Sequence, residues 1–212
     1  MARIFLAGLL GGIAMYIWTY IAYNALPLGN IGLRKLPNEP AILHALQSNI
    51  AEKSGVYLFP GLRLGSNPSD KKTEAADNLA ETVARYPSGM LIYNAAGSRP
   101  IELFRWLSVD FLIELGQVVL AVFLLSRTRL TRFSARVIFV LLIGVVAAIA
   151  TNLSNWNWYG FPSDYTLAYM FIQIVGFLCA GLVAALVLRN QEFGSASARS
   201  FLPKLSRAIS GD

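Results

Sequence analysis

The apolar residues of this 212-residue chain are gathered into four long runs. A helix needs about 20 apolar residues to cross a hydrocarbon core about 30 Å thick, and each run approaches or reaches that length. The pattern therefore predicts an all-α integral membrane protein. Its four transmembrane helices are expected at residues 1–25, 102–126, 137–152 and 167–188.

The first run admits a second interpretation, which is a cleaved signal peptide. Its apolar stretch is longer than the h-region of about 7–15 residues that signal peptides carry, and no clean small-x-small cleavage site follows it. Tyr16, Trp18, Tyr20 and Tyr23 gather toward its end, as aromatic residues do at a membrane interface. We therefore expect a transmembrane helix here.

The basic residues predict the orientation of the helices. The short connection 127–136 holds four arginines and no acid, and the segment 189–212 is also basic, whereas the connection 153–166 has no Lys or Arg. Short loops rich in arginine stay on the cytoplasmic side. We therefore expect both termini in the cytoplasm and the segment 26–101 outside it.

The composition agrees with a membrane location. Only 14% of the residues are charged, against about 25% in soluble proteins. The net charge is +6, but half of the 18 Lys and Arg residues lie in the predicted cytoplasmic parts. The positive charge is thus explained by topology and by anionic lipid, and we expect no nucleic-acid partner.

The segment 26–101 is too long for a simple connection. Apolar residues at helical spacing predict a helix around residues 42–50, and a weaker stripe predicts another over 70–86. Residues 56–59 and 90–93 have the composition of short strands. We expect a small extracytoplasmic (periplasmic) α/β domain, with the relative direction of the strands left open.

An acidic pair inside the second run is the strongest candidate for a functional site. Asp110, Glu114 and Gln117 share one helix face. A carboxylate at the centre of a membrane helix costs about 2.5–3.5 kcal/mol on insertion scales, so it needs a partner, a proton or water. Other polar residues expected at the same outer level are Asn152, Asn155, Tyr165, Tyr169 and Gln173.

Two interpretations of this polar set remain open. In the structural one, the carboxyl groups accept hydrogen bonds from Asn and Tyr side chains and hold the helices together. In the functional one, Asp110 and Glu114 line an outer-leaflet cavity for ligand binding or proton exchange.

Aromatic residues are concentrated in the connection 153–166, which is expected to be an outer loop. Rings of this kind suit a membrane interface, because their polar atoms stay wet while the rings enter the lipid. A docking face for a lipid, quinone or partner helix is the alternative. The candidate residues are Trp156, Trp158, Tyr159 and Phe161.

Small residues recur at four-residue spacing in the first and fourth runs. Such spacing allows helices to approach closely. Gly8 and Gly12 form one pair, while Gly176 and Gly181 belong to similar stripes in the fourth run. These four glycines are predicted to be helix-packing positions, either within the bundle or against another protein.

Several chemistries are excluded or disfavoured by residue counts. The single cysteine, Cys179, rules out an intramolecular disulfide and thiol–disulfide exchange within one chain. The single histidine, His44, cannot supply bis-histidine haem ligation and disfavours a histidine zinc site. No nucleophile stands beside a base. We therefore expect no cofactor and no metal, and a non-enzymatic role is favoured over an enzymatic one.

Three motifs spread over most of the chain carry a family resemblance. The chain resembles a group of small, uncharacterised bacterial four-helix inner-membrane proteins. The resemblance implies a bacterial inner-membrane location and transfers no catalytic residue. The motifs are Ala25-Leu26-Pro27-Leu28-Gly29, Gly55-Val56-Tyr57-Leu58-Phe59-Pro60, and Trp156-Asn157-Trp158-Tyr159-Gly160-Phe161-Pro162 with Tyr165-Thr166.

The expected function is a non-enzymatic accessory, assembly or scaffold role that engages a membrane protein partner, a second copy of the chain or lipid. The first alternative is a binder or transporter of a small apolar or protonatable molecule in a cavity around Glu114. The second is an enzyme acting on a lipid-linked substrate, which would need a base that the runs do not supply.

Overall fold

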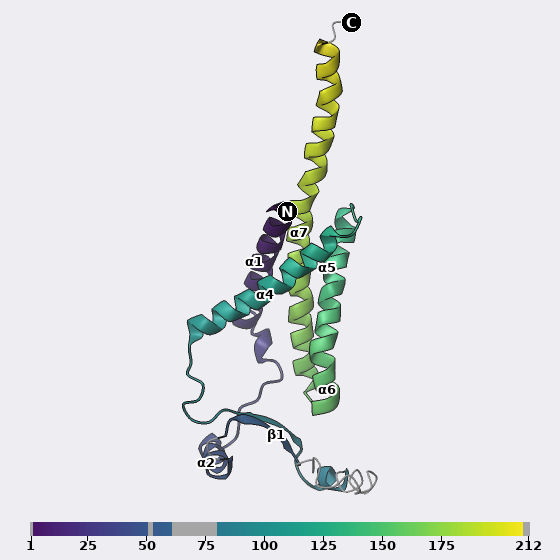
Figure 1. The fold of residues 1–212 in the computed structure, drawn as a ribbon. Helices are drawn as coiled ribbons and strands as arrows, with labels where there is room; N and C mark the ends of the chain where they lie inside the picture. The colour runs from purple at the N-terminus through teal and green to yellow at the C-terminus, as the bar shows by residue number, and fades with distance from the viewer. Residues whose placement is uncertain (1, 51–52, 61–79, 210–212) are drawn as a thin grey trace, which may run out of the picture. The chain divides into compact units, whose positions relative to one another are not determined.

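The computed structural model describes residues 2–50, 53–60 and 80–209 (Figure 1). The chain divides into two units, which are described separately. The first unit is helical and comprises Met1–Gly32, Leu103–Ser154 and Pro162–Asp212. The second unit comprises Leu33–Glu102 and Asn155–Phe161.

Within the described residues, four helices are long and apolar enough to cross a membrane, which confirms the prediction from the four runs. They span Ala2–Asn24, Leu103–Ser126, Phe133–Tyr159 and Ser163–Leu188. The first two are α1 (Ala2–Asn24) and α4 (Leu103–Ser126). The third contains α5 (Phe133–Ala148), the π-helical η2 (Ile149–Leu153) and α6 (Ser154–Tyr159).

The last two helices are longer than the sequence predicted. The connection 153–166 was expected to be a loop, but Ser154–Tyr159 is helical and Gly160, with φ +66°, begins the turn. Helix α7 (Ser163–Ile209) likewise continues through most of the segment that was expected to be a separate tail. Polar side chains do not end a helix by themselves, and the first helix breakers after the third span are Gly160 and Pro162.

The first unit is organised around α1 and α7, which pack against each other. Helix α1 also contacts α4, and α7 also contacts α5. The buried core is built largely from small and β-branched side chains, so the backbones approach closely. Its members include Ala7, Val118, Val122, Val140, Phe177, Ala180 and Ala184.

Helix α4 crosses α1 at an angle, and its two ends have different surroundings. Val118, Val122 and Leu125, in its second half, belong to the buried core. The Leu103 end diverges from α5 and α7 in Figure 1. The first half of α4, which begins at Leu103, therefore packs chiefly on α1, and this divergence positions the site described below.

The second unit contains a two-stranded sheet, as the sequence predicted. Strands β1 (Gly55–Phe59) and β2 (Gly89–Tyr93) pair antiparallel, with Gly55 opposite Tyr93 and Phe59 opposite Gly89. Helix α2 (Glu39–Ile50) precedes them. Of the helix predicted at 70–86, residues 80–85 are helical and most of the rest lies outside the described residues.

Candidate functional site

A buried carboxyl group lies between α1 and α4. Glu114 of α4 is only 7% exposed, which is rare for a glutamate. The Thr19 hydroxyl of α1 donates a hydrogen bond of 2.6 Å to Glu114 Oε1. Glu114 Oε2 has no hydrogen-bond partner among the described residues. The carboxyl group is thus held by one contact, and its second oxygen is buried without a partner among the described residues.

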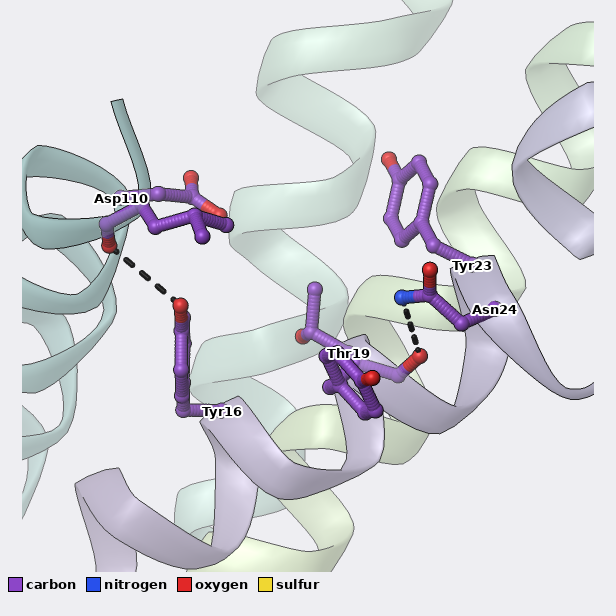
Figure 2. A pocket seen from close by; sticks show the side chains of 7 residues that line it. Tyr16, Thr19, Tyr23, Asn24 and Asp110 are labelled. Atoms are coloured by element: carbon purple, nitrogen blue, oxygen red, sulfur yellow. Dashed lines mark hydrogen bonds between the residues drawn. The ribbon is translucent and has the colours of Figure 1, made fainter. Parts of the chain in front are cut away.

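A pocket of about 240 Å³ lies beside this carboxyl group (Figure 2). Asp110 lines it, one helical turn before Glu114 on the same face of α4. Figure 2 shows the Asp110 side chain directed from α4 toward α1, where Tyr16, Thr19 and Tyr23 project. The complete lining is Tyr16, Thr19, Tyr20, Tyr23, Asn24, Leu107 and Asp110.

The spacing of the α1 residues explains how this wall forms. Tyr16, Thr19, Tyr20 and Tyr23 follow the i, i+3, i+4, i+7 pattern, so they share one helix face. The Tyr16 hydroxyl donates to the Leu107 carbonyl over 3.4 Å, and its ring makes an edge contact with Phe111 at 5.2 Å. The first half of α4 is thereby attached to α1 beside the pocket.

Three tyrosines connect α1 to the start of α7. The Tyr23 ring makes an edge contact with Tyr169 at 6.1 Å, and Tyr169 stacks on Tyr165 at 4.2 Å. The segment after α1 packs against the same rings. A Cβ on Gly29 would collide with the Tyr23 ring, and one on Gly32, whose φ is +78°, would lie 2.5 Å from Tyr165 Cβ.

A second polar cluster joins α7 to η2 and includes two of the residues singled out from the sequence. Gln173 Oε1 of α7 accepts hydrogen bonds from Thr151 Oγ1 at 3.2 Å and from Asn152 Nδ2 at 3.4 Å. Asn155 lies on α6, in the second unit. None of Asn152, Asn155, Tyr165, Tyr169 or Gln173 lines the pocket beside Asp110. Gln117 is half-buried on α4, and its Oε1 has no partner among the described residues.

The four glycines singled out from the sequence lie at contacts inside the first unit. A Cβ on Gly8 or Gly12 of α1 would meet Val119 or Leu115 of α4, at 3.0 Å and 2.7 Å. Gly176 faces Met15 at 3.2 Å, and Gly181 faces Val140 at 3.2 Å. These positions set the close approach of α1 to α4 and of α7 to its two neighbours.

The aromatic residues singled out from the sequence lie on and just after α6. Trp156, Trp158 and Tyr159 are on this helix, and Phe161 follows in the turn. Trp158 is 77% exposed. This exposure suits the interfacial role, because an indole ring at a membrane boundary contacts lipid and water at once.

The pocket residues Tyr16, Thr19, Tyr20 and Tyr23 were not among the predicted site residues. The aromatic pattern of the sequence predicted an interfacial belt for the tyrosines, and Thr19 was given no role. Their shared spacing is the signal that could have identified them, since it places all four on one face of α1.

The chemistry of the pocket follows from its lining. Its polar groups are a carboxylate, an amide and hydroxyls. All of them accept hydrogen bonds, the amide and the hydroxyls also donate them, and only the carboxylate can carry a charge, which is negative. No group of three or more His, Cys, Asp or Glu residues suited to a metal ion occurs within the described residues. No protein-family model, curated protein or solved structure matches the chain. The site must therefore be interpreted from its own geometry.

Proposed function

We propose that this chain is a non-enzymatic accessory or assembly protein of a bacterial inner membrane, and that it engages a membrane partner through the outward face of α4. The observation that carries the proposal is the environment of Gly116. A glycine inside a helix costs about 0.5–1 kcal/mol relative to alanine, so a glycine in a membrane helix is usually found where another helix approaches closely.

The other glycines of the described membrane spans each face a neighbouring helix. A Cβ on Gly11 would lie 3.0 Å from Val118, and one on Gly144 would overlap Phe177. A Cβ on Gly116 would have nothing within 4 Å. The outward face of α4 thus has a close-approach position on which no described helix of this chain packs.

The surroundings of Gly116 support a helical partner. Leu112, Ile113 and Leu120 stand one turn away from Gly116 and are 54–61% exposed. Large apolar side chains around a small residue form a hollow into which a partner helix fits. The opposite face of α4 is occupied by α1, so a partner would complete the packing of α4.

The partner proposal predicts that Gly116→Leu dissociates the complex. A Cβ at this position meets none of the described residues within 4 Å, so the leucine fills the hollow and displaces the partner while the fold is kept. Light scattering of protein purified from its native membrane in mild detergent should give a protein mass above the 23.2 kDa of one chain. The variant should give about 23.2 kDa.

The matched control is Val146→Leu, which places a leucine on an exposed position of α5. It should leave the mass of the complex unchanged. A wild-type protein that is strictly monomeric and without a partner in mild detergent would contradict the proposal. A complex that survives Gly116→Leu would place the partner elsewhere.

The proposed orientation, with both termini cytoplasmic, predicts a labelling pattern. In a Cys179→Ser background, Lys35→Cys should react with a membrane-impermeant maleimide in spheroplasts, because segment 26–101 is placed outside. Arg129→Cys, in the basic connection, should react only after the membrane is opened. Both positions are exposed, so access to the reagent depends on the side of the membrane. The reverse pattern would invert the topology.

A further inference from the structure

The pocket between α1 and α4 carries a single acidic side chain on a largely apolar and aromatic wall. The Asp110 carboxylate lines it, and no described residue forms an ion pair with that carboxylate. Glu114 lies one turn deeper, held by Thr19 of the pocket wall, with Oε2 unpartnered among the described residues. None of the seven described residues that line the pocket is Lys, Arg or His. The site therefore favours a cation and disfavours an anion.

The tyrosine rings that line the pocket favour an organic ammonium group over a metal ion. Tyr16, Tyr20 and Tyr23 line the pocket. In Figure 2, Tyr16 and Tyr23 lie on either side of Thr19, and Asp110 extends toward them from α4. Aromatic faces attract ammonium groups within about 6 Å of the ring centre. A calcium ion, by contrast, prefers six to eight oxygen ligands, and this wall offers chiefly rings and hydroxyls.

The volume of the pocket and its position along α1 suit a small organic cation. The volume of about 240 Å³ exceeds the cavity of about 150 Å³ that accommodates benzene in another protein, so a trimethylammonium or ethanolammonium group fits. Asn24, the last residue of α1, lines the pocket. The pocket therefore reaches the end of a membrane helix, which is the level at which lipid headgroups lie.

We infer that the α1–α4 pocket binds an ammonium group, with the Asp110 carboxylate as its counter-ion and the rings of Tyr20 and Tyr23 as its wall. The group belongs either to a free amine or to the headgroup of an aminophospholipid. This inference is independent of the proposed partner on α4, because Gly116 lies on a different face of that helix.

The experiment measures binding in nanodiscs of phosphatidylglycerol, a lipid that carries no ammonium group. Tetramethylammonium and ethanolamine are titrated by calorimetry as free amines, and phosphatidylethanolamine retained from a mixed bilayer is measured by native mass spectrometry. Saturable binding of a free amine assigns that source, and selective retention of phosphatidylethanolamine assigns the headgroup. If the wild-type protein binds none of the three probes, the inference is overturned.

Variants test whether the binding uses this pocket. Asp110→Asn keeps the shape and removes the charge, so the affinity should fall about tenfold or more. Tyr20→Leu should weaken binding about two- to fivefold by removing an exposed ring. Asp164→Asn is the control, because Asp164 lies in the first turn of α7 and does not line the pocket.

The Asp164→Asn control also distinguishes the loss of a charge in the pocket from the loss of a charge elsewhere on the protein. Asp164→Asn should bind with wild-type affinity. Equal affinities of wild type, Asp110→Asn and Tyr20→Leu would overturn the inference even if some ammonium binding occurs. Unchanged unfolding temperatures of the variants would show that a loss of binding is not a loss of fold. Ammonium binding and the mass of the Gly116→Leu protein are measured independently, so either proposal can be contradicted while the other stands.

Discussion

Gly144→Leu is expected to lower the free energy of unfolding of the helical unit by about 1–3 kcal/mol, the usual range for overpacking a filled core. The glycine lies on α5, where a Cβ would overlap Cβ and Cγ of Phe177 on α7. Phe177 is 1% exposed and belongs to the buried core. Neither residue has room to move, so α5 and α7 must separate. Denaturant unfolding in detergent, followed by circular dichroism, would measure the loss.

Gly116→Leu is the matched control, because it makes the same chemical change on another membrane helix. Its Cβ would meet nothing within 4 Å, and leucine has a better helix propensity than glycine. The stability of the isolated chain should therefore stay the same or rise. Equal stability of the two variants would contradict the close α5–α7 contact.

Most of the fold could be predicted from the sequence because a lipid environment restricts which backbone structures are stable. A membrane helix must satisfy its backbone hydrogen bonds internally, so long apolar runs can hardly be anything but helices. The two strands were also predicted, because Val56 and Ile92 belong to short apolar stretches that lie between turn residues. Helix ends were less predictable. Ser154–Tyr159 mixes polar and aromatic residues and was expected to lie in a loop, although nothing before Gly160 breaks the helix.

The residues that α4 contributes to the site could be predicted from the sequence, but those that α1 contributes could not. The four-residue spacing of Asp110 and Glu114 places them on one face of α4 whatever the fold. Which helix meets that face depends on packing, and Gly8 and Gly12 bring α1 there through contacts with Val119 and Leu115. Periodicity within a single helix carries no information about this choice.

Glu114 therefore has a different hydrogen-bond partner from those expected from the sequence. Polar residues at the ends of the third and fourth spans were the partners expected for the carboxyl groups. The structure instead gives Glu114 a hydrogen bond from Thr19 of the first span. Gln173, for its part, bonds with Thr151 and Asn152. The two polar clusters therefore belong to two separate helix contacts.

Thr19→Val is expected to lower the free energy of unfolding by about 1–3 kcal/mol, the penalty for a buried polar group left without a partner. Valine matches threonine in shape, so packing is kept while the 2.6 Å hydrogen bond to Glu114 Oε1 is lost. Both oxygens of Glu114 would then lack a partner among the described residues. Thr19→Ser keeps the hydroxyl and should lose much less. A Thr19→Val protein as stable as wild type would mean that this bond contributes nothing.

Combining Thr19→Val with Glu114→Leu then decides between the two interpretations of the acidic pair. Replacing both partners of a buried polar contact with apolar groups is often neutral or stabilising, because no unsatisfied group remains. We expect the double variant to recover at least wild-type stability, measured as a coupling energy in a double-mutant cycle. Recovery would mean that the fold does not need the carboxyl group. A costly group that the fold does not need is then best explained by function. A double variant less stable than either single variant would instead assign Glu114 a structural role.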